Sequence, residues 1–330
     1  MGRAPVLRFL LALPFATLGV PACSGDSAQA IPSPVGGASA TEPSPRGDGG
    51  APTSASGVAD AGAGAADAGP DAPWPGSQVL FFTFPEQRQG THPSWGAALT
   101  DLVRHLHPTY SQYDYPSERI TWGQQVSFGI SSHLRFAYNV TGKPANGFYV
   151  MKDRATLVVE PAIRLEDVAP RVPASLRGPR YQPYLVTPTR DWNDTPTFVL
   201  EEWVSFTNGS EVGVGLVAEG LWGTTTRDAV GGTLELTVYA LAFGRAVDEL
   251  DPTYFTKNPL TREFLAWNAE RAMGLYAEGM KVPAFADGAN EAYRATWTKA
   301  ADAAPLRNFA RQLFGASYCV KVLGISAAKE

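Results

Sequence analysis

The chain has 330 residues, and its 32 aspartates and glutamates outnumber its 27 lysines and arginines, which gives a formal net charge of −5. Proteins that bind nucleic acid need a concentrated positive field, and no basic run accompanies aromatic residues in this sequence. The composition therefore excludes a nucleic-acid partner. Hydrophobic residues make up 44% of the chain, which is enough to build a buried core.

The first residues have the pattern of an export signal. Arg3 and Arg8 form a basic region, and the apolar run at 9–20 is too short to span a bilayer as a helix. The run ends in Val20-Pro-Ala-Cys23, which resembles the lipobox of bacterial lipoproteins. This resemblance implies that residues 1–22 are cleaved and that Cys23 carries a lipid. The protein would then be exported and anchored by its lipid at the outer membrane or cell surface; an ordinary signal peptide is the alternative.

A linker is predicted at residues 23–75. Between 24 and 73 the chain consists almost entirely of Gly, Ala, Ser, Pro, Thr and Asp, with no aromatic residue. Such a segment cannot bury enough apolar surface to offset the entropy of ordering, so we expect a disordered tether. With Cys23 lipidated, Cys319 has no partner for an intramolecular disulfide. The single globular domain expected at 76–330 must therefore be stabilised by its hydrophobic core.

The folded region begins with a predicted strand and a predicted helix. Residues 78–84 are β-branched and aromatic and stop at Pro85, which is typical of a strand. Residues 94–107 predict a helix, because apolar residues recur along one face. His105 and His107 point to different faces of this helix and make a poor metal pair. We expect both to be exposed and to complement the dipole at the helix C-terminus.

A central helix and a hairpin are predicted next. Thr121 and Gln124 form a capping box, which starts a helix that should run from Trp122 to Ala137. The apolar and β-branched runs at 148–151 and 155–160 flank a short polar turn, Lys152-Asp-Arg154, and this pattern predicts a β-hairpin. The thirty or so residues that follow are rich in proline and are expected to be irregular.

The second half of the chain is predicted to be helical. Thr195-Pro196 is a typical helix start, and Asn208-Gly209 is a typical helix end. Further helices are expected at 228–250, 261–278, 290–300 and 305–314. The sequence therefore predicts an α+β fold, in which a small β-sheet or hairpin is followed by a helical half.

The segment Trp122-Gly-Gln-Gln-Val-Ser-Phe-Gly-Ile is similar to the His-Glu-x-x-His helix of glutamate-type zincin metallopeptidases. In that helix two histidines four positions apart bind one zinc, and the glutamate activates a water. The matching positions hold Gln124 and Phe128 in place of the ligands and Gln125 in place of the base. The resemblance thus implies a degenerate, zincin-like domain without metal or cofactor, in which these residues would serve binding. The alternative is a core helix with a glutamine-rich polar face.

A second candidate site combines acids with tryptophans. Glycoside hydrolases use two carboxylates that flank a sugar ring, and the sugar stacks on an aromatic face. One acid would be Asp191 or Asp194, and the other Glu201 or Glu202, which also lie where a zincin keeps its third ligand. Trp192 and Trp203 would line an open groove for the glycan. The alternative is structural, with Asp194 as a cap and the glutamates on a solvated first turn.

These patterns together predict a membrane-anchored cell-envelope lipoprotein. Its domain is expected to act by binding a glycan or protein ligand, as a pseudoenzyme rather than an enzyme. The alternative is a cell-envelope hydrolase, acting on glycan or peptide, that uses the acids of residues 191–203. A mainly structural envelope component is a third interpretation.

Overall fold

A computed structural model of the chain describes residues 73–87, 89, 95–105, 135–140, 143–223, 228–285 and 287–328, all of which belong to one compact unit, 62–330. The predicted export signal, Cys23 and most of the predicted linker lie outside the described residues. So do His107, the capping box at Thr121 and the candidate binding residues Gln124, Gln125 and Phe128. The interpretations that depend on these residues stay predictions.

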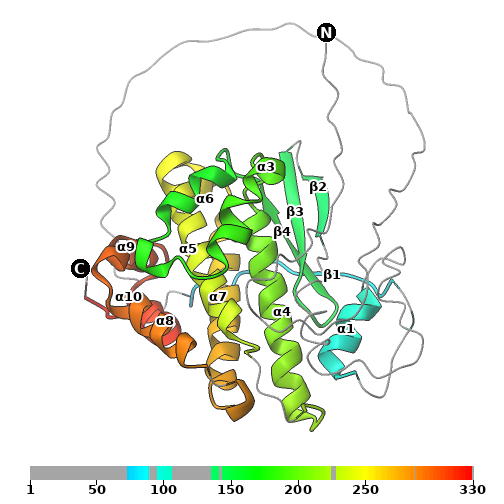
Figure 1. Ribbon diagram of the computed structural model, residues 1–330. Coiled ribbons are helices and arrows are strands. Elements are labelled where there is room, and N and C mark those ends of the chain that lie inside the picture. The colour runs from blue at the N-terminus through cyan, green and yellow to red at the C-terminus, as the bar shows by residue number, and fades with distance from the viewer. Residues whose placement is uncertain are drawn as a thin grey trace, which may run out of the picture. The chain divides into compact units, whose positions relative to one another are not determined.

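A four-stranded antiparallel sheet lies at one flank of the domain, with the strand order β1–β4–β3–β2 (Figure 1). The strands are β1 (Phe82–Thr83), β2 (Arg135–Val140), β3 (Lys143–Tyr149) and β4 (Arg154–Val159). β3 pairs with β4 so that Tyr149 lies opposite Ala155, across the turn predicted at Lys152-Asp-Arg154. The predicted hairpin is therefore confirmed.

Several boundaries in this half differ from the prediction. The helix predicted from residue 94 begins at Ala97, and β3 begins at Lys143, before the run predicted at 148–151. β1 is shorter than the strand predicted at 78–84. The helix predicted to reach Ala137 is wrong at its C-terminal end, because Arg135 pairs with Phe148 and Ala137 with Asn146 in the β2–β3 ladder. β3 supplies the backbone partners for this segment, and strand pairing of that kind overrides a helical spacing of apolar residues.

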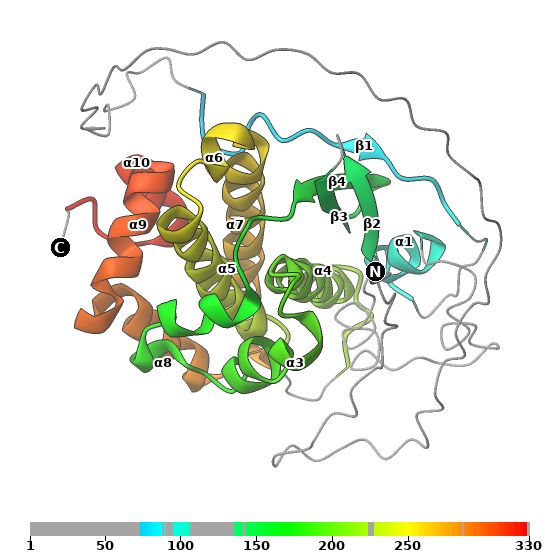
Figure 2. The same ribbon diagram turned by 90° about the horizontal axis from the view of Figure 1, so that it is seen from above.

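Three long helices form the centre of the domain. α4 (Phe198–Ala218), α5 (Gly231–Leu250) and α7 (Pro259–Gly279) pack against one another, and α4 also contacts β3. Figure 2 shows them between the sheet and the C-terminal helices. The other helices are α1 (Ala97–His105), α3 (Thr189–Trp192), α6 (Tyr254–Lys257), α8 (Gly288–Lys299), α9 (Ala304–Phe314) and α10 (Ala316–Tyr318). The predicted α+β fold, a small sheet followed by a helical half, is confirmed.

The central helices are buried on most of their circumference. α5 has buried residues on all sides, and a Cβ at Gly244 would lie 3.2 Å from the ring of Phe309, so this glycine lets α9 approach closely. α4 continues through Asn208-Gly209, where the sequence predicts its end. Asn208 is buried there, and its side chain donates to the carbonyl of Tyr149 (3.2 Å) and accepts from Arg271 (2.7 Å). These contacts outweigh the local preference for a helix end.

The proline-rich segment predicted to be irregular forms a series of short turns. These are the 3-10 turns Leu165–Asp167, Ala169–Arg171 and Ala174–Leu176 and the π-type turn Gln182–Val186. Each turn buries an apolar side chain in the main core, which keeps the segment packed against the helices. Three further short turns, Pro283–Phe285, Ala301–Ala303 and Cys319–Leu323, lie in the C-terminal region.

The first described residues lie along α7. The backbone N–H of Gly76 donates to Glu263 of α7 (2.7 Å). On either side of this contact, Trp74 packs on Tyr318 with ring centroids 5.1 Å apart, and Phe81 packs on Trp267 at 4.9 Å. The segment is therefore held by aromatic contacts on both sides of one anchoring hydrogen bond.

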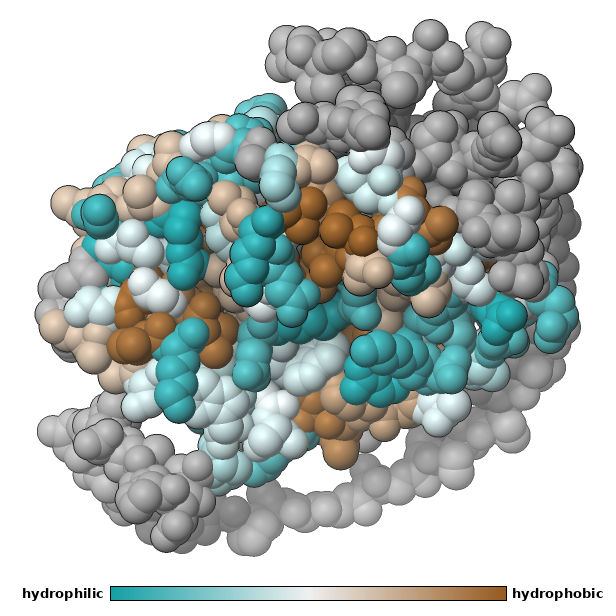
Figure 3. All heavy atoms as spheres, turned by 90° about the horizontal axis from the view of Figure 1, so that it is seen from below, coloured by the Kyte–Doolittle hydropathy of each residue, from teal (hydrophilic) through white to brown (hydrophobic). Residues whose placement is uncertain are grey.

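The surface of the domain is mixed in character. Figure 3 shows one face on which apolar residues form separate patches bordered by hydrophilic ones. The large exposed apolar residues among those described are Leu80, Leu221, Leu250, Leu260 and Val320. None of the described helices is long and apolar enough to cross a membrane.

Candidate functional site

The turn between β3 and β4 has an unusual backbone. Met151, Lys152 and Asp153 have φ values of 73°, 57° and 56°, so three consecutive non-glycine residues are left-handed. Side chains with a Cβ rarely adopt this conformation, and each such residue costs of order 1 kcal/mol or more. The surrounding structure must therefore hold the turn in place. Turns of this kind gather at ligand sites, which directs attention to the residues around it.

Asp101 of α1 and Tyr149 of β3 hold the turn. The Asp101 carboxylate accepts the N–H of Lys152 (2.9 Å) and the hydroxyl of Tyr149 (2.8 Å). The Tyr149 hydroxyl in turn accepts the N–H of Asp153 (3.2 Å). Burial, and then the charge of Asp101, raise the pKa of Tyr149, so its hydroxyl stays a donor at every physiological pH. The backbone N–H groups of Lys152 and Asp153 thus fix the turn, because their acceptors are the side chains of Asp101 and Tyr149 and lie outside the turn.

His105 completes this anchor, and its predicted exposure is wrong because only 1% of its surface is accessible. Its Nδ1 lies 2.7 Å from the backbone carbonyl of Asp101, which can only accept, so Nδ1 carries a proton. Its Nε2 lies 2.9 Å from the Asp153 carboxylate.

Asp101, His105 and Asp153 are close enough together to be considered as a metal site. One ligand atom from each residue lies within 4.8 Å of those of the other two. Asp153 lies at Nε2, and Asp101 lies on the Nδ1 side at 3.5 Å. These carboxylates are already engaged with the turn and the imidazole, because Asp101 accepts the N–H of Lys152 and Asp153 contacts Nε2 of His105. The cluster acts as a clamp on the turn.

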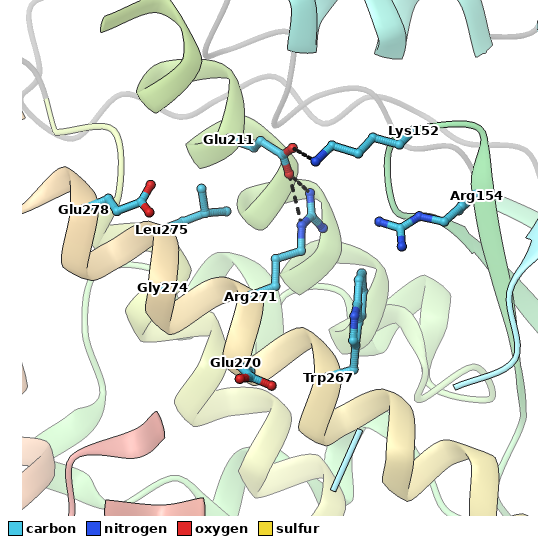
Figure 4. A pocket seen from close by; sticks show the side chains of 9 residues that line it. All are labelled: Lys152, Arg154, Glu211, Trp267, Glu270, Arg271, Gly274, Leu275 and Glu278. Atoms are coloured by element: carbon cyan, nitrogen blue, oxygen red, sulfur yellow. Dashed lines mark hydrogen bonds and ion pairs between the residues drawn. The ribbon is translucent and has the colours of Figure 1, made fainter. Parts of the chain in front are cut away.

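The turn directs two cations into a pocket on α7. The pocket has a volume of about 340 Å³. It is lined by Lys152, Arg154, Glu211, Trp267, Glu270, Arg271, Gly274, Leu275 and Glu278. Lys152 and Arg154 come from the hairpin, Glu211 from α4 and the other residues from α7 (Figure 4). Residues far apart in the sequence therefore meet at one concave site.

Arg271 is partly neutralised. Its Nε and Nη2 donate to Glu211 (3.1 and 2.6 Å), and Nη2 also donates to Asn208. Nη1 is buried and has no hydrogen-bond partner within the described part of the chain. Burial lowers the pKa of Arg271 and the charge of Arg154 lowers it further, whereas Glu211 raises it. The guanidinium therefore keeps one donor available on the side of the pocket where a second cation lies.

Arg154 is that second cation. Its guanidinium lies over the rings of Phe81 (5.0 Å) and Trp267 (5.7 Å), and Arg271 lies 5.8 Å from the same Trp267 ring. Among the residues that the structure describes, Arg154 forms no ion pair, and its buried Nε has no hydrogen-bond partner. Figure 4 shows the two guanidinium groups facing one another above Trp267. An oxyanion between them would accept from both and remove their repulsion.

The predicted acidic site is not assembled as one cluster. Glu201 and Glu202 are buried in α4, at 4% and 5% exposure, so their expected position on a solvated first turn is wrong. Burial raises the pKa of Glu202 well above its ordinary range, and the charge of Glu201 adds to this effect. Asp191 lies at the surface and pairs with Arg190 (3.0 Å), and the exposed Asp194 lies 3.8 Å from Arg164.

The two tryptophans of the predicted groove also lie in different environments. Trp203 is 1% exposed, and its indole N–H donates to Thr237 (3.0 Å) in the core. Trp192 is partly buried and stacks on Phe198 with ring centroids 5.5 Å apart. An open groove lined by both residues is therefore wrong. Neither the α7 pocket nor the neighbouring pocket described below contains any of the predicted acids or tryptophans.

The sequence did signal part of the α7 pocket. The turn Lys152-Asp-Arg154 was recognised as polar, and a turn with two cations around one acid projects charge from a hairpin end. Arg271 and Trp267 gave no such signal, because a single arginine or tryptophan on a long helix is common. Comparison of the chain with protein-family models, with curated proteins and with solved structures gave no match.

Proposed function

We propose that the protein is an exported, lipid-anchored binding protein of the bacterial cell envelope whose domain captures a small anionic ligand in the α7 pocket. The lipobox-like Val20-Pro-Ala-Cys23 and the linker after it support the anchored location. One observation carries the binding role. Arg154 and Arg271 face one another across the pocket, and each has a buried N–H group that no acceptor among the described residues satisfies.

The energetics of the two arginines favour a ligand. A half-buried cation without a partner lowers stability, and a second cation beside it adds repulsion. Glu211 offsets this cost for Arg271, but no carboxylate does so for Arg154 among the described residues. A carboxylate, sulfate or phosphate group can accept from two guanidinium groups at once, and guanidinium stays charged at every physiological pH. Binding of an anion therefore explains why Arg154 has no carboxylate partner among the described residues and why it lies beside a second cation.

The site suits binding better than the predicted hydrolase chemistry. A glycoside hydrolase needs two carboxylates that reach one sugar, and Glu201 and Glu202 are buried in the helical core while Asp191 and Asp194 are exposed. Binding without turnover also agrees with the degenerate zincin-like segment at 122–130, where glutamine and phenylalanine replace the catalytic residues.

Calorimetric titration of the purified mature chain tests this function. Hexanoate and sulfate serve as anionic probes, and hexanol serves as the neutral control for hexanoate. We expect both anions to bind and hexanol not to bind. Arg154→Gln should weaken hexanoate about tenfold or more, because it removes a charge-assisted hydrogen bond of about 1.5–3 kcal/mol.

Arg190→Gln is the matched control, because Arg190 is exposed and, among the described residues, pairs with its neighbour Asp191 alone. Its affinity for hexanoate should equal that of the wild-type protein. Absence of binding by both anions, or equal affinities in Arg154→Gln and the wild type, would refute the proposed function.

A further inference from the structure

A second pocket lies next to the first on α7. Its volume is about 630 Å³. It is lined by Trp74, Glu270, Met273, Gly274, Tyr276, Ala277, Arg294, Lys321 and Val322. Glu270 and Gly274 line both pockets, so the two cavities meet along one stretch of α7.

The second pocket also contains cations without a carboxylate partner. Arg294 of α8 contacts the sulfur of Met273 (3.8 Å), and Lys321 lies over the ring of Trp74 (5.1 Å). Within the described part of the chain, neither side chain forms an ion pair. Burial lowers the pKa of Arg294, which reflects the cost of placing this cation where no acid compensates it.

Gly274 leaves the space between the pockets open. A Cβ at this position would meet no atom within 4 Å, so the glycine is not required by close packing. Glycine in the middle of a helix costs about 1 kcal/mol relative to alanine. The loss of helix stability at Gly274 is explained if the position must stay free of a side chain to connect the two cavities. Met273, Ala277 and Val322 give the second pocket an apolar wall beside the passage.

The charges along the two pockets favour an anion at each end. Together the pockets contain five cations, Lys152, Arg154, Arg271, Arg294 and Lys321, and three carboxylates, Glu211, Glu270 and Glu278. Glu211 is already paired with Arg271. Figure 4 shows the carboxylate of Glu270 pointing away from Arg154 and Arg271. Arg154 at one end, and Arg294 and Lys321 at the other, therefore remain without a carboxylate partner among the described residues.

We infer that the two pockets form one groove for an elongated ligand with an apolar middle and an anionic group at each end. One anionic group is held by Arg154 and Arg271, and the other by Arg294 and Lys321. This inference rests on the proposed function for the first anionic group. The second group adds affinity because both ends bind as one molecule, so the second contact is intramolecular.

A series of α,ω-dicarboxylates from succinate to dodecanedioate, each compared with its monomethyl ester, tests the inference by calorimetry on the mature chain. Diacid and ester share the same carbon chain between the two carboxyl groups, and they differ by one charge and one methyl group. We expect the best diacid to bind about tenfold or more tightly than its ester. Arg294→Gln should reduce the diacid to the affinity of the ester and leave the ester unchanged.

Gly274→Leu should have the same effect as Arg294→Gln, because its side chain fills the passage. Gly288→Leu is the matched control, since a Cβ at Gly288 also meets no atom within 4 Å and this residue lines neither pocket. It should bind diacid and ester as the wild type does.

The possible failures are distinct. If esters bind and no diacid binds more tightly than its ester, the single groove is refuted and the anion pocket stands. If neither esters nor diacids bind, the proposed function fails and the groove fails with it. An equal loss for diacid and ester in Arg294→Gln would show that Arg294 does not hold the second anionic group, which also overturns the inference.

Discussion

The buried carboxyl of Glu202 makes stability depend on pH in a way that Glu202→Gln should remove. Burial and the charge of Glu201 raise the pKa of Glu202 in the folded state. The folded protein therefore keeps a proton on Glu202 at pH values where the unfolded chain has released it. The contribution of Glu202 to stability is complete below its pKa in the unfolded chain, near 4.5. This contribution is lost as the pH rises through the higher pKa of Glu202 in the folded protein.

The size of the effect follows from one proton. Between the two pKa values the folded state binds up to one proton more than the unfolded state, so the free energy of unfolding falls by at most about 1.4 kcal/mol per pH unit. Glutamine has nearly the same shape as a protonated glutamate and has no charge to desolvate. Glu202→Gln should therefore be more stable than the wild type at pH 8 and similar to it at pH 4.

Denaturation by urea at pH values from 4 to 8.5 provides the measurement. The difference in unfolding free energy between Glu202→Gln and the wild type should grow as pH rises. Glu278→Gln is the control, because Glu278 is exposed and the same chemical change there should leave the pH profile unaltered. Parallel profiles for Glu202→Gln and the wild type would show that Glu202 is charged in the folded state, and the reasoning from burial would be refuted.

Two further predictions concern the turn clamp and the anchor. His105→Leu removes the contacts of the imidazole with Asp101 and Asp153. It should lower the free energy of unfolding by about 2 kcal/mol and weaken hexanoate binding, because the turn that carries Arg154 loses its clamp. Unchanged stability and affinity would contradict that role. Cys23→Ser should abolish incorporation of labelled palmitate in a bacterial host and release the protein from the membrane fraction; continued labelling would contradict lipidation at Cys23.

The elements that the sequence predicts well are those with strong local signals. The hairpin was predicted because two β-branched runs flank a polar turn, and the helices at 261–278 and 305–314 agree with α7 and α9 within two residues at each end. α4 was predicted to end too early, because Asn208-Gly209 is a local stop signal. The tertiary contacts that override it come from β3 and α7, and the local sequence does not contain them.

The burial of Glu201 and Glu202 had a signal that was misinterpreted. The segment Phe198-Val-Leu-Glu-Glu-Trp-Val-Ser-Phe206 is apolar on all sides of a helix. Such a helix has no solvated face, so its acids must be buried wherever they point. A first-turn acid is usually interpreted through the helix dipole, but the apolar surroundings were the stronger signal here.

The candidate site could not be predicted as a whole, because it depends on contacts between distant segments. Arg154 and Arg271 meet only because α7 packs against the hairpin. The burial of His105 depends likewise on the turn folding back over α1. Each of these residues has an ordinary local context, and the combination becomes informative only when the fold places their charges together.

Several features around the hairpin turn lower the stability of the domain, which indicates that the α7 pocket binds a ligand. Three left-handed residues and two opposed arginines each lower the stability of the ligand-free domain. Residues without these charges would pack at lower cost at the positions of the two arginines. The clamp formed by Asp101, Tyr149 and His105 fixes the turn, and the fixed turn holds Arg154 against a cation that repels it. Local strain and opposed charges at one site are explained together if an anion completes the pocket.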